Sequence, residues 1–121
     1  DITKDTILLE EEDYPTWYID VFDNYEKYLG KTIRFKSFVR DILPETIVIG
    51  RNVMTCCEND IQFLGYEVID ETGSMVSIGD CIYLDCVVTH EYSSFAKEEV
   101  VMLHAKKIAK LPKEEEKILS L

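Results

Sequence analysis

The sequence has no apolar run long enough to cross a bilayer and no N-terminal signal peptide. We therefore expect no membrane span within this chain. Its 121 residues are 46% hydrophobic and 31% charged, and a domain of this size buries roughly two thirds of the surface that its unfolded chain exposes. Such a domain needs neither a metal nor a disulfide to be stable. Because the chain begins on charged residues, we expect it to be a piece of a longer protein.

Positive charge is scarce. Thirteen basic residues stand against 24 acidic ones, which gives a net charge of −11. Binding a phosphate backbone needs a lysine or arginine for each contact, so we expect no nucleic-acid partner. The sequence has two local basic clusters. One is formed by Lys31, Arg34, Lys36 and Arg40, and the other by Lys106, Lys107 and Lys110. We expect both on charged outer faces of strands.

Catalytic and metal-binding motifs are also lacking. The sequence contains no glycine-rich phosphate loop and no nucleophile elbow, so we expect no enzymatic activity. It contains no CxxC pair, and its four cysteines are too sparse to imply a disulfide framework. We predict no cofactor. Zinc stays open as an alternative, with ligands drawn from Cys56, Cys57, His90 and His104.

An apolar stripe predicts one helix near the N-terminus. Within residues 16–30, Trp17, Val21 and Tyr25 recur at helical spacing. Thr16 can accept hydrogen bonds from the free N–H groups of the first turn, and Gly30 suits the left-handed end of a helix.

From residue 31 the period of the apolar pattern changes to two, which indicates strands at 31–39, 46–57, 63–69, 80–92 and 99–111. Adjacent Phe38 and Val39 break the alternation and predict a bulge. The chain is thus mainly β, and a small five-stranded OB-like barrel with an N-terminal helix fits best. Residues 70–79 are too few for the helix that OB barrels usually carry there, which keeps an SH3-like barrel open.

The chain shows no internal repeat and no shift in composition. We divide it into an extended lead-in at 1–15, the helix and OB-like barrel at 16–111, and a charged tail at 112–121 that frays or forms a loose helix.

Two adjacent cysteines follow the second predicted strand in the stretch "RNVMTCCEND". Side chains alternate faces along a strand, so Cys56 and Cys57 cannot share one metal unless the chain turns at Thr55. We expect one thiol to pack in the core and the other to be exposed near Arg51, whose charge favours the thiolate. A strained, easily reduced disulfide between the two is the alternative. Asp60 is expected to brace the turn.

The segments "YLGKTIRFKSFV" and "IGRNVMTCCENDIQFLGYEV" resemble the C-terminal domain of the YcgQ-type family. The double-cysteine block is the specific part of this match, which covers residues 14–111. These are bacterial proteins of unknown function, predicted to form a two-component membrane complex with a separate permease. The resemblance implies that this chain is a soluble module, held at the cell membrane by a preceding region, on a side that it leaves open.

Three functional hypotheses follow. The first, carried by the resemblance, is a non-enzymatic module that docks a permease or another subunit of a transport complex. In it, Arg51 and Asp60 brace the cysteine turn. The second is metal or thiol sensing at Cys56 and Cys57. The third, binding of single-stranded nucleic acid on the barrel face, is the weakest because the net charge opposes it.

Overall fold

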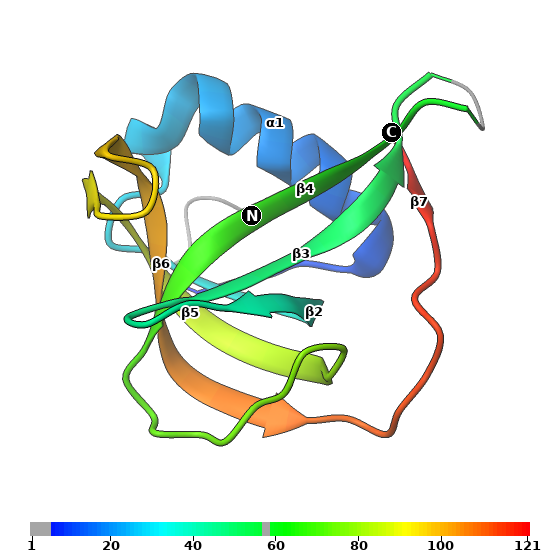
Figure 1. The fold of residues 1–121 in the computed structure, drawn as a ribbon. Coiled ribbons are helices and arrows are strands. Elements are labelled where there is room, and N and C mark those ends of the chain that lie inside the picture. The colour runs from blue at the N-terminus through cyan, green and yellow to red at the C-terminus, as the bar shows by residue number, and fades with distance from the viewer. Residues whose placement is uncertain (1–5, 57–58) are drawn as a thin grey trace.

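The computed structural model describes residues 6–56 and 59–121. Five long strands form a closed barrel (Figure 1): β2 (Thr32–Ile42), β3 (Ile47–Met54), β4 (Ile61–Asp70), β5 (Cys81–Ser93) and β6 (Glu98–Lys110). Each strand pairs antiparallel with its barrel neighbour except β4 and β6, which run parallel, and β2 closes the ring by pairing with both β3 and β5. This Greek-key order is that of an OB barrel. It confirms the predicted fold class and removes the SH3-like alternative.

The period-two pattern explains the barrel wall. In β2, Ile33 and Phe35 are buried, whereas Arg34 faces solvent. The register of β2 against β3 shifts between Val39 and Asp41, next to the predicted bulge. Residues 71–80 carry no helix, as their number predicted. The barrel core is formed mainly by Ile33, Phe35, Ile49, Val53, Val68, Ile82, Leu84, Cys86, Val88 and Leu103.

The N-terminal helix α1 (Tyr14–Asn24) lies across one end of the barrel. The helix begins two residues before the predicted cap, Thr16. Pro15 is accommodated in the first turn because proline has no N–H, and the N–H groups of a first turn have no partner within the helix. Tyr14, Trp17 and Val21 face the barrel and are buried. The Tyr14 hydroxyl donates to the Leu64 carbonyl at 2.8 Å, which fixes the helix against β4.

Short elements connect the helix to the barrel. Strand β1 (Thr6–Leu8) runs parallel to β2, and the 3-10 turn η1 (Glu11–Asp13) leads into α1. The turn η2 (Tyr25–Lys27) follows the helix, and Gly30 then adopts a φ of 79°, which is the left-handed conformation predicted for it. None of the described helices is long and apolar enough to span a membrane.

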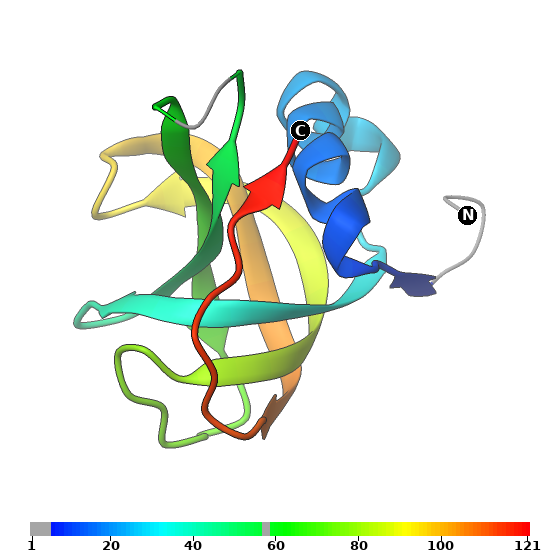
Figure 2. The ribbon, with the colours of Figure 1, turned by 90° about the vertical axis from the view of Figure 1, so that its right-hand side faces the viewer.

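The tail differs from its prediction. It is neither frayed nor helical: it runs extended across the barrel (Figure 2) and ends in β7 (Leu119–Ser120), which pairs parallel with β3. Leu119 is 4% exposed and belongs to the core. The charged composition of the tail suggested a solvated segment, but one apolar side chain and the free edge of β3 are enough to dock it.

Two glycines face each other across β3 and β4. Gly50 and Gly65 are register partners, and the ring of Phe63 lies over both. A Cβ built on Gly50 would lie 2.4 Å from the Leu64 carbonyl oxygen and 2.6 Å from the Gly65 Cα. Arg40 covers the outer face of the Phe63 ring at 4.4 Å from its centroid. The pair therefore lets two backbones and an aromatic ring approach closely.

Candidate functional site

Two turns and the strand between them enclose a hollow of about 560 Å³. The β2–β3 turn and the β5–β6 turn lie on the same side of the barrel in both views (Figures 1 and 2). The hollow is lined by Leu43, Pro44, Glu45, Thr46, Glu67, Ile69, Glu91, Tyr92, Ser94, Phe95 and Met102. In OB barrels these turns are where ligands bind.

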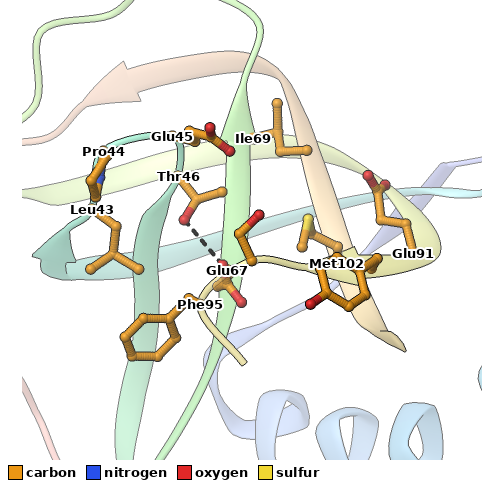
Figure 3. A pocket seen from close by; sticks show the side chains of 11 residues that line it. Leu43, Pro44, Glu45, Thr46, Glu67, Ile69, Glu91, Phe95 and Met102 are labelled. Atoms are coloured by element: carbon orange, nitrogen blue, oxygen red, sulfur yellow. Dashed lines mark hydrogen bonds between the residues drawn. The ribbon is translucent and has the colours of Figure 1, made fainter. Parts of the chain in front are cut away.

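Glu67 connects the two turns. Its side chain and that of Thr46 point toward one another (Figure 3), and the Thr46 hydroxyl donates to the carboxylate at 3.1 Å. From the other side the Ser93 hydroxyl also donates to Glu67. Ser93 in turn accepts the backbone N–H of Ala96 at 2.9 Å, which shapes the β5–β6 turn. One strand residue thus sets the distance between the two walls of the hollow.

A second hollow, of about 530 Å³, continues the first toward α1. The two hollows share Glu67 and Phe95, and we call them together the acidic groove. On the helix side its wall includes Phe22, which is 78% exposed, and Tyr25, whose ring stacks on His90 with centroids 4.3 Å apart.

The acidic groove combines negative charge with exposed aromatic rings. Its lining includes five glutamates, and none of the described residues that line it is a lysine or arginine. Phe22, Tyr92 and Phe95 are all more than half exposed. Exposed apolar groups beside carboxylates can contact a ligand that carries both a cation and an apolar group. The carboxylates also repel phosphate groups. The glutamates are Glu45, Glu67, Glu91, Glu98 and Glu99.

An ion-pair cluster lies at the rim of the groove. The two ring nitrogens of His104 lie 2.7 Å from Glu71 and 2.6 Å from Glu91. Burial lowers the pKa of His104, but the two carboxylates outweigh it and the net pKa is raised. The pKa of Glu91 is lowered by the Thr89 hydroxyl and by His104, and that of Glu71 by Lys106 and His104.

We expect this cluster to make the stability of the domain depend on pH. A raised pKa in the folded state means that His104 stabilises the fold below its ordinary pKa of 6.5. This contribution is lost as the pH rises through the raised value. The free energy of unfolding should therefore fall as the pH rises above 6.5 in the wild type and fall less in His104→Gln. Urea denaturation across this range is the measurement.

His90→Gln is the matched control for that series, because His90 stacks on a tyrosine rather than bridging carboxylates. It should keep the wild-type decline with pH. If His104→Gln and His90→Gln gave the same pH profile, the cluster would not be the cause.

The cysteine turn is only partly as predicted. Strand β3 ends at Met54, so the doublet follows the strand rather than completing it. Cys56 is exposed, and Cys57 lies outside the described residues, so the inequivalence of the two thiols stays a prediction. Asp60 does brace the turn: the Thr55 hydroxyl donates to its carboxylate at 2.9 Å, and the Thr55 N–H donates to its carbonyl at 3.0 Å.

The contacts of Arg51 with other described residues lie outside that turn. Its side chain is 1% exposed, on the same face of β3 as Ile49 and Val53. Its guanidinium lies 3.5 Å from Glu11 and 3.6 Å from Glu116 and donates to the Lys117 carbonyl at 3.0 Å. The alternation of the strand turns Arg51 inward toward the lead-in and the tail, so its described contacts do not support the predicted role beside the cysteines.

Three of the predicted metal candidates, Cys56, His90 and His104, are described, and the structure does not bring them together. His90 and His104 lie on the paired strands β5 and β6, as expected, but His90 pairs with Val101, and residues 101 and 104 face opposite sides. Cys56 follows the end of β3, and that end of β3 lies on the opposite side of the barrel from the β5–β6 turn (Figure 1). Over residues 6–56 and 59–121, no three His, Cys, Asp or Glu side chains form a ligand cluster.

The other two cysteines are buried. Cys86 lies in the core, and Cys81 lies beneath the tail with its thiol 3.9 Å from the Glu114 carboxylate. Burial raises the pKa of both thiols. Because the thiolate is the reactive form, neither thiol is poised for chemistry.

Alkylation under native conditions should separate the exposed from the buried thiols. In a Cys57→Ser background, iodoacetamide should modify Cys56 about tenfold faster or more than Cys81 and Cys86. Denaturation should make all three react alike. Adding Cys56→Ser should remove the fast phase, and a fast phase that persisted would place a reactive thiol where the fold shows a buried one.

Sequence reasoning missed the acidic groove. Glu67, Thr46 and Ser93 come from three distant segments, and only the barrel brings them within hydrogen-bond distance. One signal was present: the turn "SSFAKE" places Phe95 among small and charged residues. An aromatic ring at the tip of a turn, 68% exposed here, indicates a contact surface more than a core position.

The fold defines a class of protein, an OB-type barrel domain whose end is covered by an N-terminal helix. The sequence model of the DUF1980 C-terminal domain matches residues 1–118, and the chain belongs to that family. The family is one of domains without an established function. No curated protein matches the chain.

Proposed function

We propose that this domain is a non-enzymatic docking module that holds a segment of a partner protein in the acidic groove. The observation that carries the proposal is the lining itself: five glutamates without a described lysine or arginine, beside three exposed aromatic side chains. Aromatic rings at the centre of an interface contribute most of its binding energy, and complementary charge selects the partner. The segment that fits is one that carries lysine or arginine next to an aliphatic or aromatic side chain.

The groups that could do chemistry near the groove already have structural roles. The Ser93 hydroxyl is buried and bonded to Glu67 and Ala96. His104 is held between two carboxylates, and His90 is stacked on Tyr25. A nucleophile must reach its substrate as well as a base, and the Ser93 hydroxyl is buried away from the groove surface. This supports binding rather than catalysis.

The resemblance to the YcgQ-type family supports the choice of partner. It implies a membrane complex with a separate permease, so we propose that the groove docks a basic segment of that permease or of another subunit. The domain itself would be held at the cell membrane by the region that precedes it in the whole protein.

The test is co-purification of the full-length protein with the permease subunit after Phe95→Ser. Phe95 lines both hollows and is 68% exposed, so the substitution should leave folding intact. We expect recovery of the permease to fall about tenfold or more, the usual effect of removing a central aromatic contact. Met75→Ser is the matched control, because Met75 is an apolar residue 84% exposed outside the groove. Equal recovery in both variants would contradict the proposal.

Thiol sensing is a second candidate function, because one thiol is exposed. Cys56 lies in a turn whose shape depends on Thr55 and Asp60, so modification of the thiol can alter the turn. Binding of single-stranded nucleic acid is the weaker alternative, because the glutamates of the groove repel a phosphate backbone.

A further inference from the structure

The barrel has an open seam between β2 and β3. These strands pair with each other only between Phe38 and Ile42 on one side and Ile47 and Gly50 on the other. Beyond Gly50 the edge of β3 is completed by the tail, which crosses the barrel in Figure 2. Val53 and Met54 pair with Leu119 and Ser120, and the Leu121 N–H donates to the Met54 carbonyl at 3.1 Å.

Two cations line this seam. Lys36 is ion-paired with Glu11 at 2.7 Å and also with Glu114 of the tail. Arg51 lies 3.6 Å from Glu116 and donates to the Lys117 carbonyl. Its Nε and Nη1 atoms are buried and have no hydrogen-bond partner among the described residues. A buried guanidinium without a nearby carboxylate is costly, so the seam favours an occupant that brings carboxylates, as the tail does with Glu116 at 3.6 Å from Nε.

The tail is held at three anchor positions. Glu114 pairs with Lys36, and Glu116 accepts the backbone N–H of Asn52 at 2.6 Å. Leu119 is buried in the core, whereas the side chains from 112 to 118 are exposed or partly exposed. The anchors define a short pattern, Glu-x-Glu-x-x-Leu, in an extended chain that lies along a strand edge. This arrangement is the one by which peptides bind through strand addition.

We propose that the seam is a strand-addition site for an extended segment of the form Glu-x-Glu-x-x-Leu. The chain's own tail fills it in this structure, and the same segment of a second copy can replace it. A second copy is the occupant that fits, because it carries the identical anchors and the exchange conserves every contact. Residues 112 and 113, which connect the tail to β6, are exposed. This site is separate from the acidic groove, so either proposal can fail without the other.

The test uses a fluorescent peptide of residues 111–121 and a full-length chain whose own tail is weakened by Glu116→Ala and Leu119→Ser. We expect the peptide to bind this variant at least tenfold more tightly than the wild type, in which the attached tail competes. Adding Arg51→Met to the variant should weaken the peptide about tenfold. A peptide with Leu119→Ser should not bind, whereas one with Glu115→Ala, at an exposed position, should bind like the original.

The dimer is measured by light scattering on the wild type at high protein concentration. Because each copy carries a charge of −11, association by tail exchange should rise with salt, which screens the repulsion. A dimer that persists after Leu119→Ser must form through another surface, which would contradict the tail exchange. A wild type that stays monomeric at every salt concentration would contradict it as well.

If the tail variant does not fold, hydrogen exchange in the wild type tests the proposal instead. In the wild type the amides of Asn52 and Leu121, which depend on the tail, should exchange at least tenfold faster than that of Val39 within the barrel. Equal protection would show that the tail does not leave the seam and would overturn the proposal. So would a folded tail variant that fails to bind the peptide.

Discussion

Replacing Trp17 with alanine should lower the free energy of unfolding by about 3–5 kcal/mol, the range measured for truncating a buried aromatic side chain. Trp17 is 5% exposed, and its ring contacts those of Tyr14, Phe35 and Tyr66 at centroid distances of 5.7–5.8 Å. It is the side chain through which α1 covers the end of the barrel. The midpoint of urea denaturation measures the loss.

Trp17→Phe is the matched variant, because the indole Nε1 is buried without a hydrogen-bond partner among the described residues. The indole therefore contributes packing and no hydrogen bond, so phenylalanine should retain most of the stability. If Trp17→Phe cost as much as Trp17→Ala, the N–H would have a partner and the packing account would be wrong.

Replacing Gly50 with alanine should cost about 3 kcal/mol and lower the melting temperature by roughly 10 °C. The added Cβ would lie 2.4–2.7 Å from two backbone atoms and from the ring of Phe63. The backbone atoms belong to the neighbouring strand and cannot move without breaking the β3–β4 ladder. A thermal melt followed by circular dichroism is the measurement.

Gly73→Asn separates this effect from the loss of a glycine in general. Gly73 adopts a φ of 70°, which asparagine tolerates, and a Cβ there would meet nothing within 4 Å. It should melt within a few degrees of the wild type. A Gly50→Ala variant that melted as high as Gly73→Asn would show that the strands lie farther apart than described.

The barrel could be predicted because its strands alternate. Ile33, Phe35, Ile49 and Val53 sit at every second position, and such a pattern fixes one face toward a core. The helix was predicted by the same reasoning at a period of 3.6. Its start was misplaced by two residues, because proline in a first helical turn resembles the end of a loop in a sequence read alone.

The sequence could predict which face of the strand carries Arg51, but not which residues Arg51 contacts. The alternation already placed Arg51 on the face of Ile49, which is the buried face. Its partners, Glu11 and Glu116, lie 40 and about 65 residues away in segments that read as solvated charge. Nothing local indicates that these carboxylates meet a buried cation, because the contact exists only when the lead-in and the tail close the seam.

The acidic groove could not be predicted for the same reason, because its residues meet only in the folded barrel. The glutamates that line it come from three strands and one turn, and each is an ordinary surface charge when taken alone. Net charge predicted that nucleic acid is a poor partner. It could not predict that five of the 24 acidic residues gather around exposed aromatic rings.

The most direct test of the docking account is an NMR titration of the ¹⁵N-labelled domain with peptides that cover the non-membrane segments of the permease. At least one basic peptide should bind and shift the amide signals of Thr46, Glu67 and Phe95, which lie around the groove. The signals of Arg51 and Cys56 should stay in place. Shifts confined to Arg51 or Cys56, or no shift with any peptide while an oligothymidine binds with salt-dependent affinity, would contradict the account.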